Sequence, residues 1–389
     1  MNLLKIFIDK IKPAFEKDGK LKMFHSTFEA FESFLFVPNT TNNKGVHIRD
    51  VNDLKHTMTV VVVALIPTLL FGMWNTGYQH QLAIGGDMTF FGMFWFGFLK
   101  VLPIIIVSYV VGLGIEFVSA QLRGHEVNEG FLVTGLLIPL IMPVNCPLWM
   151  IGLATAFAVI IGKEVFGGTG MNVFNPALLA RAFVFFAYPS QISGTKVWVA
   201  GMESGNTIID GFSGATPLAH AAANEINQLP SFSDMFFGFI PGSIGETSTL
   251  TILLGAAVLI YTGIGSWKVM TACVAGVVGT SLLCNIFAVN AYMELPFYYH
   301  LVMGGFAFGA VFMATDPVSG AQTETGKWIY GALIGVLVIV VRLFNPGYPE
   351  GMMLAILFMN VFAPLIDHYV VEANIKRRIR RVQKYKKIG

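Results

Sequence analysis

The sequence has 389 residues, of which 54% are hydrophobic and 12% are charged, and its formal net charge is +2. An average soluble chain is about 25% charged, so these values exclude a soluble globular domain, and we expect no nucleic-acid partner. The apolar stretches are continuous and rich in Gly, Ala, Leu and Phe, whereas strands of a membrane barrel alternate over segments of about 10 residues. The composition therefore predicts an all-α integral membrane protein. The cysteines have neither zinc-site nor disulfide-framework spacing, so we predict no metal site and interpret them as packing residues: Cys146, Cys273 and Cys284.

Residues 1–56 lack the uninterrupted apolar core of a cleavable signal peptide. Apolar side chains recur there at steps of three and four among Lys, Glu and His: Phe24, Phe28, Phe31, Leu35 and Phe36. This spacing predicts an amphipathic segment on the cytoplasmic face of the membrane. Two functions fit it, a surface anchor and an aromatic wall beside a lipid-soluble ligand.

After residue 56 the sequence predicts about ten membrane spans, because a helix needs roughly 20 apolar residues to cross a bilayer. The third and fifth spans are short. The spans lie at about 57–76, 100–120, 131–143, 147–163, 174–188, 248–265, 269–288, 298–315, 328–344 and 351–371. They form two five-helix halves, 57–188 and 248–371, separated by a connection at 189–247 and followed by a basic tail at 372–389.

The basic residues predict the orientation of these spans. With both termini in the cytoplasm, 21 of the 25 Lys and Arg residues fall in residues 1–56 (the leader), in the basic tail or in the inner loops. The positive-inside rule favours this arrangement. The connection 189–247 then faces outward, which in a bacterial inner membrane means the periplasm.

Two segments interrupt the apolar pattern with Gly and Pro, namely 167–176 and 312–317. They occupy similar positions in the two halves. Interrupted helices at corresponding points are a sequence sign of an internal repeat with a central site. We therefore predict two inverted five-helix repeats with broken helices.

The most specific short motif is Asp-Gly-Phe-Ser-Gly-Ala-Thr-Pro at 210–217. Taken by itself, it is either an ordinary turn or a modification site. In the second interpretation, small residues leave the Thr216 hydroxyl unshielded and Pro217 restricts the chain beside it. Asp210 would offer a carboxylate for metal-assisted phosphoryl transfer to that hydroxyl.

This motif resembles the attachment signature of covalently bound FMN. The whole chain resembles the B subunit of the Na+-translocating NADH:quinone oxidoreductase (Na+-NQR). The likeness extends from the leader to the basic tail and includes His-Glu-Val-Asn-Glu-Gly at 125–130, Gly-Lys-Glu-Val-Phe-Gly-Gly-Thr-Gly at 162–170, Ile-Pro-Gly-Ser-Ile-Gly-Glu at 240–246, Met-Ala-Thr-Asp-Pro-Val at 313–318 and Tyr-Pro-Glu-Gly-Met-Met at 348–353.

The resemblance implies a flavin-bearing subunit of a respiratory sodium pump that is not active alone. FMN would be joined through its phosphate to Thr216 by an external flavin transferase, within the motif that contains Asp210, Ser213, Gly214 and Ala215. A non-covalent riboflavin is also implied. So are electron transfer from the FMN of the C subunit through both flavins to ubiquinone or menaquinone, and partnership with the A, C, D, E and F subunits of the same complex.

Polar residues of the first interrupted segment are candidates for riboflavin: Thr169, Asn172 and Asn175. The two asparagines would share one face if the segment were helical. The alternative is that they only satisfy the broken backbone before Pro176.

Carboxyl groups near span ends are candidates for the sodium path, since a charge within a span is costly. Asp316 and Asp367 lie near cytoplasmic helix ends, and the resemblance implies roles in sodium uptake for both and for Glu129. Phe308 and Phe312, at i and i+4, would close a hydrophobic gate. The alternative is that Asp316 caps a helix and the phenylalanines pack.

A quinone would enter from lipid on the inner side. We predict its contacts at the junction of the leader with the third span: Phe24, Phe28, Glu29, Gly130 and Phe131. Residues at this junction are also implicated by the resemblance.

Two other functions share parts of this pattern. The D subunit of the related ferredoxin:NAD oxidoreductase has a similar core and flavin motif but typically lacks the long leader and the basic tail. A cofactor-free channel of urea-transporter-like architecture is the alternative from another class. A passive channel has no use for a flavin attachment motif.

Overall fold

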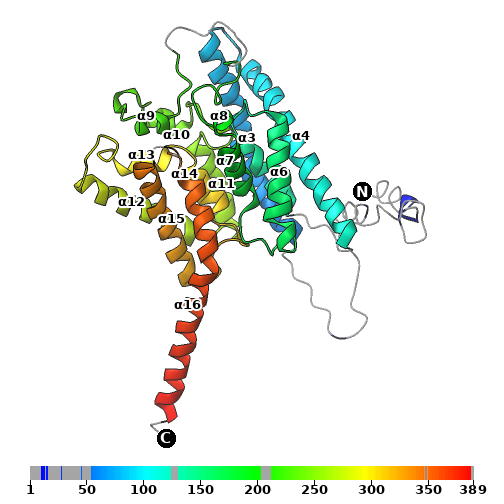
Figure 1. The fold of residues 1–389 in the computed structure, drawn as a ribbon, viewed down its shortest axis with the longest axis vertical. Helices are drawn as coiled ribbons and strands as arrows, with labels where there is room; N and C mark the ends of the chain where they lie inside the picture. Colours follow the sequence, from blue (N-terminus) through cyan, green and yellow to red (C-terminus); the bar gives the residue numbers. More distant parts are fainter. Residues whose placement is uncertain are drawn as a thin grey trace.

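The computed structural model describes residues 54–123, 130–202, 212–345, 347 and 349–386, together with 10–13, 15, 28 and 45 (Figure 1). Over these residues the chain is helical and contains no strand. Six of the described helices are long and apolar enough to cross a membrane: Lys55–Ile84, Phe90–Arg123, Leu148–Phe166, Trp267–Ile286, Glu324–Phe344 and Met352–Gln383. The prediction of an all-helical membrane protein is therefore confirmed.

The first half of the molecule contains five apolar helices: α3 (Leu54–Ile84), α4 (Phe90–Arg123), α5 (Phe131–Ile141), α6 (Leu148–Gly162) and α7 (Pro176–Ala187). Glycines let α3 and α4 approach closely. A Cβ atom on Gly77 would lie 2.0 Å from the Met93 carbonyl oxygen, and one on Gly97 would lie 1.7 Å from that of Met73. Small residues at such contacts are typical of helices packed in a bilayer.

The connection between the halves contains α8 (Pro189–Ile192), α9 (Pro217–Ala222), the 3-10 turn η3 (Ile226–Gln228) and α10 (Phe232–Phe237). These short elements lie at one end of the helix array, at the end opposite the C-terminus (Figure 1). Residues of α9, η3 and α10 form a small core of their own with residues near α13, whereas Ile192 of α8 belongs to the main core.

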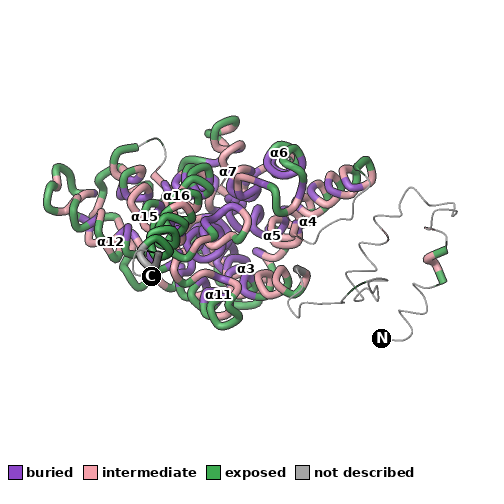
Figure 2. Tube along the Cα trace, turned by 90° about the horizontal axis from the view of Figure 1, so that it is seen from below, coloured by how far each residue is buried: buried purple, intermediate pink, exposed green. Residues whose placement is uncertain are grey.

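The second half contains α11 (Thr249–Tyr261), α12 (Trp267–Ile286), α13 (Phe297–Val302), α14 (Phe306–Phe308), the π-helical turn η4 (Gly309–Met313), α15 (Glu324–Phe344) and α16 (Met352–Lys386). The halves interlock, because α11 packs against α3 and α16 packs against α7. Buried residues gather at the centre of the array and exposed ones at its periphery (Figure 2).

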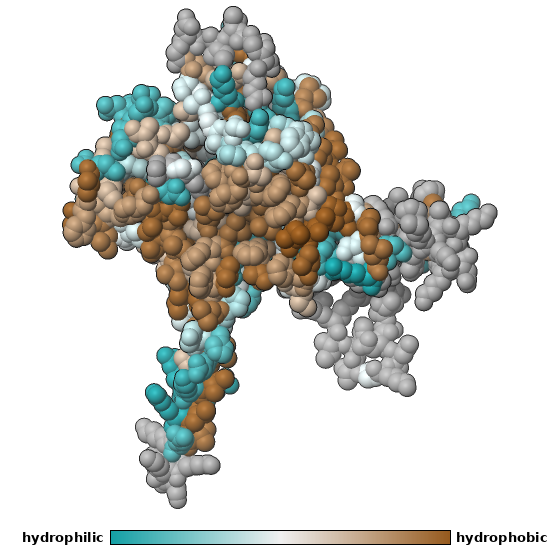
Figure 3. Space-filling view, viewed as in Figure 1, coloured by the Kyte–Doolittle hydropathy of each residue, from teal (hydrophilic) through white to brown (hydrophobic). Residues whose placement is uncertain are grey.

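A hydrophobic belt surrounds the helix array (Figure 3). Hydrophilic side chains cover the end that carries the connection between the halves, and they reappear on the projecting part of α16. Many large apolar side chains of the long helices are exposed, for example Phe91 at 80% and Leu122 at 81% on α4. Such surface is stable only against lipid or a partner protein.

Both predicted interruptions occur in the structure. Between α6 and α7 the chain makes a 3-10 turn, η2 (Glu164–Phe166), and then runs irregularly through 167–175, where three glycines have positive φ. Residues 314–323 likewise form turns between η4 and α15. The eighth predicted span, 298–315, is not one helix, because it divides into α13, α14 and η4. The number of ten spans and their inverted symmetry stay predictions.

Candidate functional site

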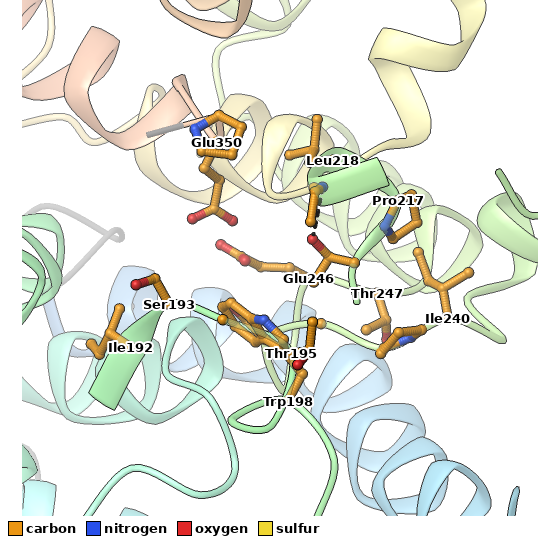
Figure 4. A pocket seen from close by; sticks show the side chains of 18 of the residues that line it. Ile192, Ser193, Thr195, Trp198, Pro217, Leu218, Ile240, Glu246, Thr247 and Glu350 are labelled. Atoms are coloured by element: carbon orange, nitrogen blue, oxygen red, sulfur yellow. Dashed lines mark hydrogen bonds between the residues drawn. The ribbon is translucent and has the colours of Figure 1, made fainter. Parts of the chain in front are cut away.

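The first candidate site is a cavity of ≈ 170 Å³ beside Thr216, which we call the Thr216 cavity. Its walls come from α7, the chain after α8, the start of α9, the segment before α11 and the turn before α16 (Figure 4). Most of the lining is apolar, and Trp198 supplies an aromatic surface. A few polar groups interrupt these walls, which is the usual balance of a ligand pocket.

Thr216 is the N-cap of α9. Its hydroxyl oxygen accepts a hydrogen bond from the Ala219 backbone N–H at 3.3 Å, and Pro217 occupies the first helical position. This is the arrangement expected when threonine precedes proline at a helix start. Gly214 is required just before it, since a Cβ atom there would lie 2.2 Å from the Thr195 carbonyl oxygen. The motif thus packs tightly while Thr216 itself is only half-buried.

Three charged side chains lie in the wall of the Thr216 cavity. Arg181 of α7 is 2% exposed and forms an ion pair with Glu350 at 3.3 Å. Its guanidinium group also lies 5.5 Å from the centre of the Trp198 ring. Glu246 is buried next to them, and burial followed by the charge of Glu350 raises the pKa of Glu246 well above its usual range.

The second candidate site is a pocket of ≈ 100 Å³ between the two broken segments, which we call the Asn175–Asp316 pocket. Asn175 caps α7, because its Oδ1 accepts hydrogen bonds from the backbone N–H groups of Ala177 at 3.0 Å and Leu178 at 3.3 Å. Its Nδ2 donates to Asp316 Oδ2 at 3.1 Å. The interrupted helices of the two halves are therefore joined by a side-chain hydrogen bond.

Asp316 has further partners within its own turn. It accepts hydrogen bonds from the Ser319 hydroxyl at 2.8 Å and from the Val318 backbone N–H at 3.1 Å. Burial raises the pKa of its carboxyl group, although these hydrogen bonds oppose the shift. Asp367 of α16 holds the far end of the same turn, since its carboxylate accepts from the backbone N–H groups of Gln322 at 2.7 Å and Thr323 at 2.9 Å.

A buried ion pair lies at the edge of the Asn175–Asp316 pocket. Lys163, which lines the pocket, pairs with Glu116 of α4, and both side chains are at most 5% exposed. The Lys163 ammonium group also lies 6.0 Å from the centre of the Phe131 ring. Within the described part of the chain, no group of three His, Cys, Asp or Glu side chains is arranged to hold a metal ion.

Comparison with known proteins decides which family has these features. The sequence model described as the NQR2, RnfD, RnfE family matches residues 41–376. The chain belongs to this family. It is 48% identical to the B subunit of the Na(+)-translocating NADH-quinone reductase of Ectopseudomonas mendocina, over 97% of this chain and 99% of the relative. The corresponding B subunits of Stutzerimonas stutzeri and Azotobacter vinelandii are 46% and 45% identical over the same shares.

Membership of the NQR2, RnfD, RnfE family confirms the predicted resemblance. The structure places several predicted site residues together. Thr169, Asn172 and Asn175, predicted for riboflavin, line one pocket with Gly130, predicted for quinone, and with Phe312 and Asp316, predicted for sodium. The asparagines meet there although residues 171–175 are not helical.

Other predicted residues lie apart from that pocket. Phe131 is fully buried, and Phe308 is also fully buried with its ring 5.0 Å from that of Phe312. Phe28 stacks on Phe15 at 4.6 Å, and no described contact joins it to Gly130 or Phe131. The remaining predicted residues lie outside the described residues: Phe24, Glu29, Glu129 and Asp210.

Sequence reasoning gave no role to the charged wall of the Thr216 cavity or to the Glu116–Lys163 pair. Arg181 carried a signal, because a cation inside an apolar segment needs a partner. Glu246 and Glu350 stand within two of the motifs that marked the resemblance. The sequence contains nothing that would have joined these three residues in space.

Proposed function

We propose that the chain is the B subunit of a Na+-translocating NADH-quinone reductase in a bacterial inner membrane, with ten spans in two inverted repeats. It relays electrons from the FMN of the C subunit through a covalent FMN and a riboflavin to quinone, and it contributes to the sodium path. The A, C, D, E and F subunits are its partners. The observation that carries the proposal is Thr216, whose flavin-attachment motif lies at a cavity with a buried cationic and aromatic wall.

The residues around Thr216 fit a tethered flavin. The Thr216 hydroxyl would carry the phosphodiester, with Ser213, Gly214 and Ala215 leading into it. Trp198 and its aliphatic neighbours offer the apolar surface that a flat ring needs, and Arg181 and Glu246 offer polar contacts at its edge. When bound, the flavin supplies redox chemistry that protein side chains lack. The chain itself positions that group against these walls.

The Asn175–Asp316 pocket is the proposed place for riboflavin and for the inner end of the sodium path. Thr169 and Asn172 present polar side chains beside apolar walls from α5 and α11. Asp316 is the half-buried carboxyl group of this pocket, and the buried Phe312 closes one side of it. Quinone contacts at Gly130 would lie on the same pocket. In this arrangement the groups that transfer electrons and the carboxyl group that binds the cation would lie in one pocket and share lining residues.

The decisive experiment is in-gel flavin fluorescence of the denatured subunit, co-expressed with a flavin transferase. The chain with its native Thr216 is expected to fluoresce and Thr216→Val to be dark. Thr195→Val is a matched control, because Thr195 lies in the same cavity outside the attachment motif.

Fluorescence in Thr216→Val would place the attachment on another residue. A dark native band, with transferase activity verified on another acceptor, would favour the cofactor-free channel. The redox function is supported if the native chain and Thr195→Val fluoresce and Thr216→Val does not.

A further inference from the structure

The wall of the Thr216 cavity holds two carboxyl groups in contact. Glu246 is 6% exposed and the Glu350 side chain is 15% exposed. The charge of Glu350 raises the pKa of Glu246, as expected for a second carboxyl group close by. Figure 4 shows the two carboxyl groups facing one another at the cavity. A hydrogen bond between two carboxyl groups requires a proton on one of them, because carboxylates only accept.

The positive charge around this pair is limited. Among the described ion pairs, Arg181 is the one cation that contacts either carboxyl group, at 3.3 Å from Glu350. Arg342 of α15 lies nearby, but its guanidinium group donates to the backbone carbonyl oxygens of His300 at 2.6 Å, Met303 at 2.8 Å and Glu350 at 3.3 Å. Two ionised carboxylates would therefore face one ion-paired cation in a buried place, which like-charge repulsion disfavours.

The backbone leaves room for this contact. A Cβ atom on Gly305 would lie 2.5 Å from Glu246 Oε1, so no larger residue fits there without displacing the carboxyl group. Gly351 follows Glu350 with φ of +68°, and a Cβ atom on it would lie 2.9 Å from the Val338 carbonyl oxygen. Gly305 thus leaves room for the Glu246 carboxyl group, and Gly351 permits the turn that follows Glu350.

We propose that Glu246 and Glu350 share one proton at neutral pH, and that this pair is a proton-exchanging site facing the cavity beside Thr216. The pair then carries one negative charge, which Arg181 balances. When the proton leaves for solvent, a second negative charge remains at the cavity wall. No bond other than the carboxyl O–H is broken.

A consequence follows for the bound cofactor, and this step rests on the proposed attachment of flavin at Thr216. Extra negative charge at the wall disfavours the addition of electrons to a group held in the cavity. Deprotonation of the pair would therefore lower the midpoint potential of that flavin as pH rises. The carboxyl pair would make the potential at this position depend on pH.

The first test requires no flavin. Full-length Thr216→Val chain, purified with its co-purifying subunits and labelled with ¹³C-glutamate, is measured by infrared spectroscopy. A protonated glutamic acid carbonyl band is expected at neutral pH, lost at high pH and absent when Glu246→Gln is added. Glutamate labelling separates this band from that of the half-buried Asp316. Glu225→Gln is the matched control, because Glu225 lies in the same connection with a half-exposed side chain paired to His220.

Absence of the band from the Thr216→Val chain at neutral pH would overturn the proposal. Its persistence in a folded Glu246→Gln variant would do so as well. Should that variant fail to fold, the pH titration of the band in the otherwise native chain decides, since a band that is unchanged up to high pH would contradict an exchanging proton.

The second test measures the midpoint potential of flavin-loaded protein against pH by spectroelectrochemistry. The native slope is expected to be reduced in Glu246→Gln and retained in Glu225→Gln. An unchanged slope in Glu246→Gln would overturn the link to the cofactor. If Thr216 carries no flavin but the infrared band is present, the proposed function fails while the proton-sharing pair stands.

Discussion

Asp316 accepts hydrogen bonds from three partly buried donors at once, from Asn175, Ser319 and the Val318 backbone. Removing its carboxylate with Asp316→Ala would leave these donors without an acceptor. A buried unsatisfied group costs about 1–3 kcal/mol, so we expect the variant to be destabilised by about that amount. Thermal unfolding in detergent measures the effect. Asp87→Ala, at an exposed acid, is the control. Equal unfolding temperatures of the two variants would contradict a stabilising role for the hydrogen bonds to Asp316.

The raised pKa of Glu246 predicts how stability changes with pH. Above the usual glutamate pKa of about 4.3 the unfolded chain releases this proton, whereas the folded chain keeps it until the raised pKa is reached. The folded state then binds more protons, so the free energy of unfolding falls as pH rises through that interval. Glu246→Gln should flatten this part of the profile. If the unfolding temperatures of the native chain and of Glu246→Gln changed with pH in the same way, the prediction would be refuted.

Individual candidate residues could be named from the sequence where a local pattern marks them. Thr216 stands in a motif, and Asn175 precedes a proline at a helix start. Their surroundings were not predictable in this way. Asn175 and Asp316 are 141 residues apart in the chain, and the contact of Glu246 with Glu350 depends on the packing of the second half. No local periodicity encodes either contact.

At the level of helices, glycine spacing sets the packing of α12 on α15. A Cβ atom on Gly276 would lie 2.3 Å from the Ala332 carbonyl oxygen, whereas one on Gly279, a turn further along α12, would meet nothing within 4 Å. Gly276→Ala should therefore destabilise the protein by about 1–3 kcal/mol, since the helices must separate. Gly279→Ala is the matched control and should have little effect. Equal unfolding temperatures would show that α12 and α15 are not packed through Gly276.

The length of an apolar segment does not always predict one continuous helix. The predicted span at 298–315 is divided at Met303–Gly305, where Gly304 has φ of +61°. The helix can stop there because Arg342 donates to the carbonyl oxygens of His300 and Met303. A freed carbonyl in an apolar environment needs such a partner. The donor lies about forty residues downstream, so the sequence of the span alone does not reveal the break.

At the scale of the whole molecule, the hydrophobic belt separates two polar ends (Figure 3). One end carries the connection between the halves, and the other carries the projecting part of α16, where residues 376–383 are exposed and rich in Lys and Arg. Composition predicted the belt, and the positions of Lys and Arg predicted which end faces the cytoplasm. The interlocking of α11 with α3 and of α16 with α7 was not predictable, because it depends on the shapes of packed faces.

This arrangement predicts opposite accessibility for two engineered cysteines. In a chain with Cys146, Cys273 and Cys284 replaced by alanine, Ala223→Cys and Gln383→Cys each introduce one exposed thiol, at the end of α9 and in the tail of α16. A maleimide that crosses the outer but not the inner membrane should label the first in intact cells and the second only after the inner membrane is disrupted. The chain without cysteines should stay unlabelled. Labelling of both from one side would place α9 and the tail on the same face of the membrane, which would contradict the arrangement with the apolar belt between them (Figure 3).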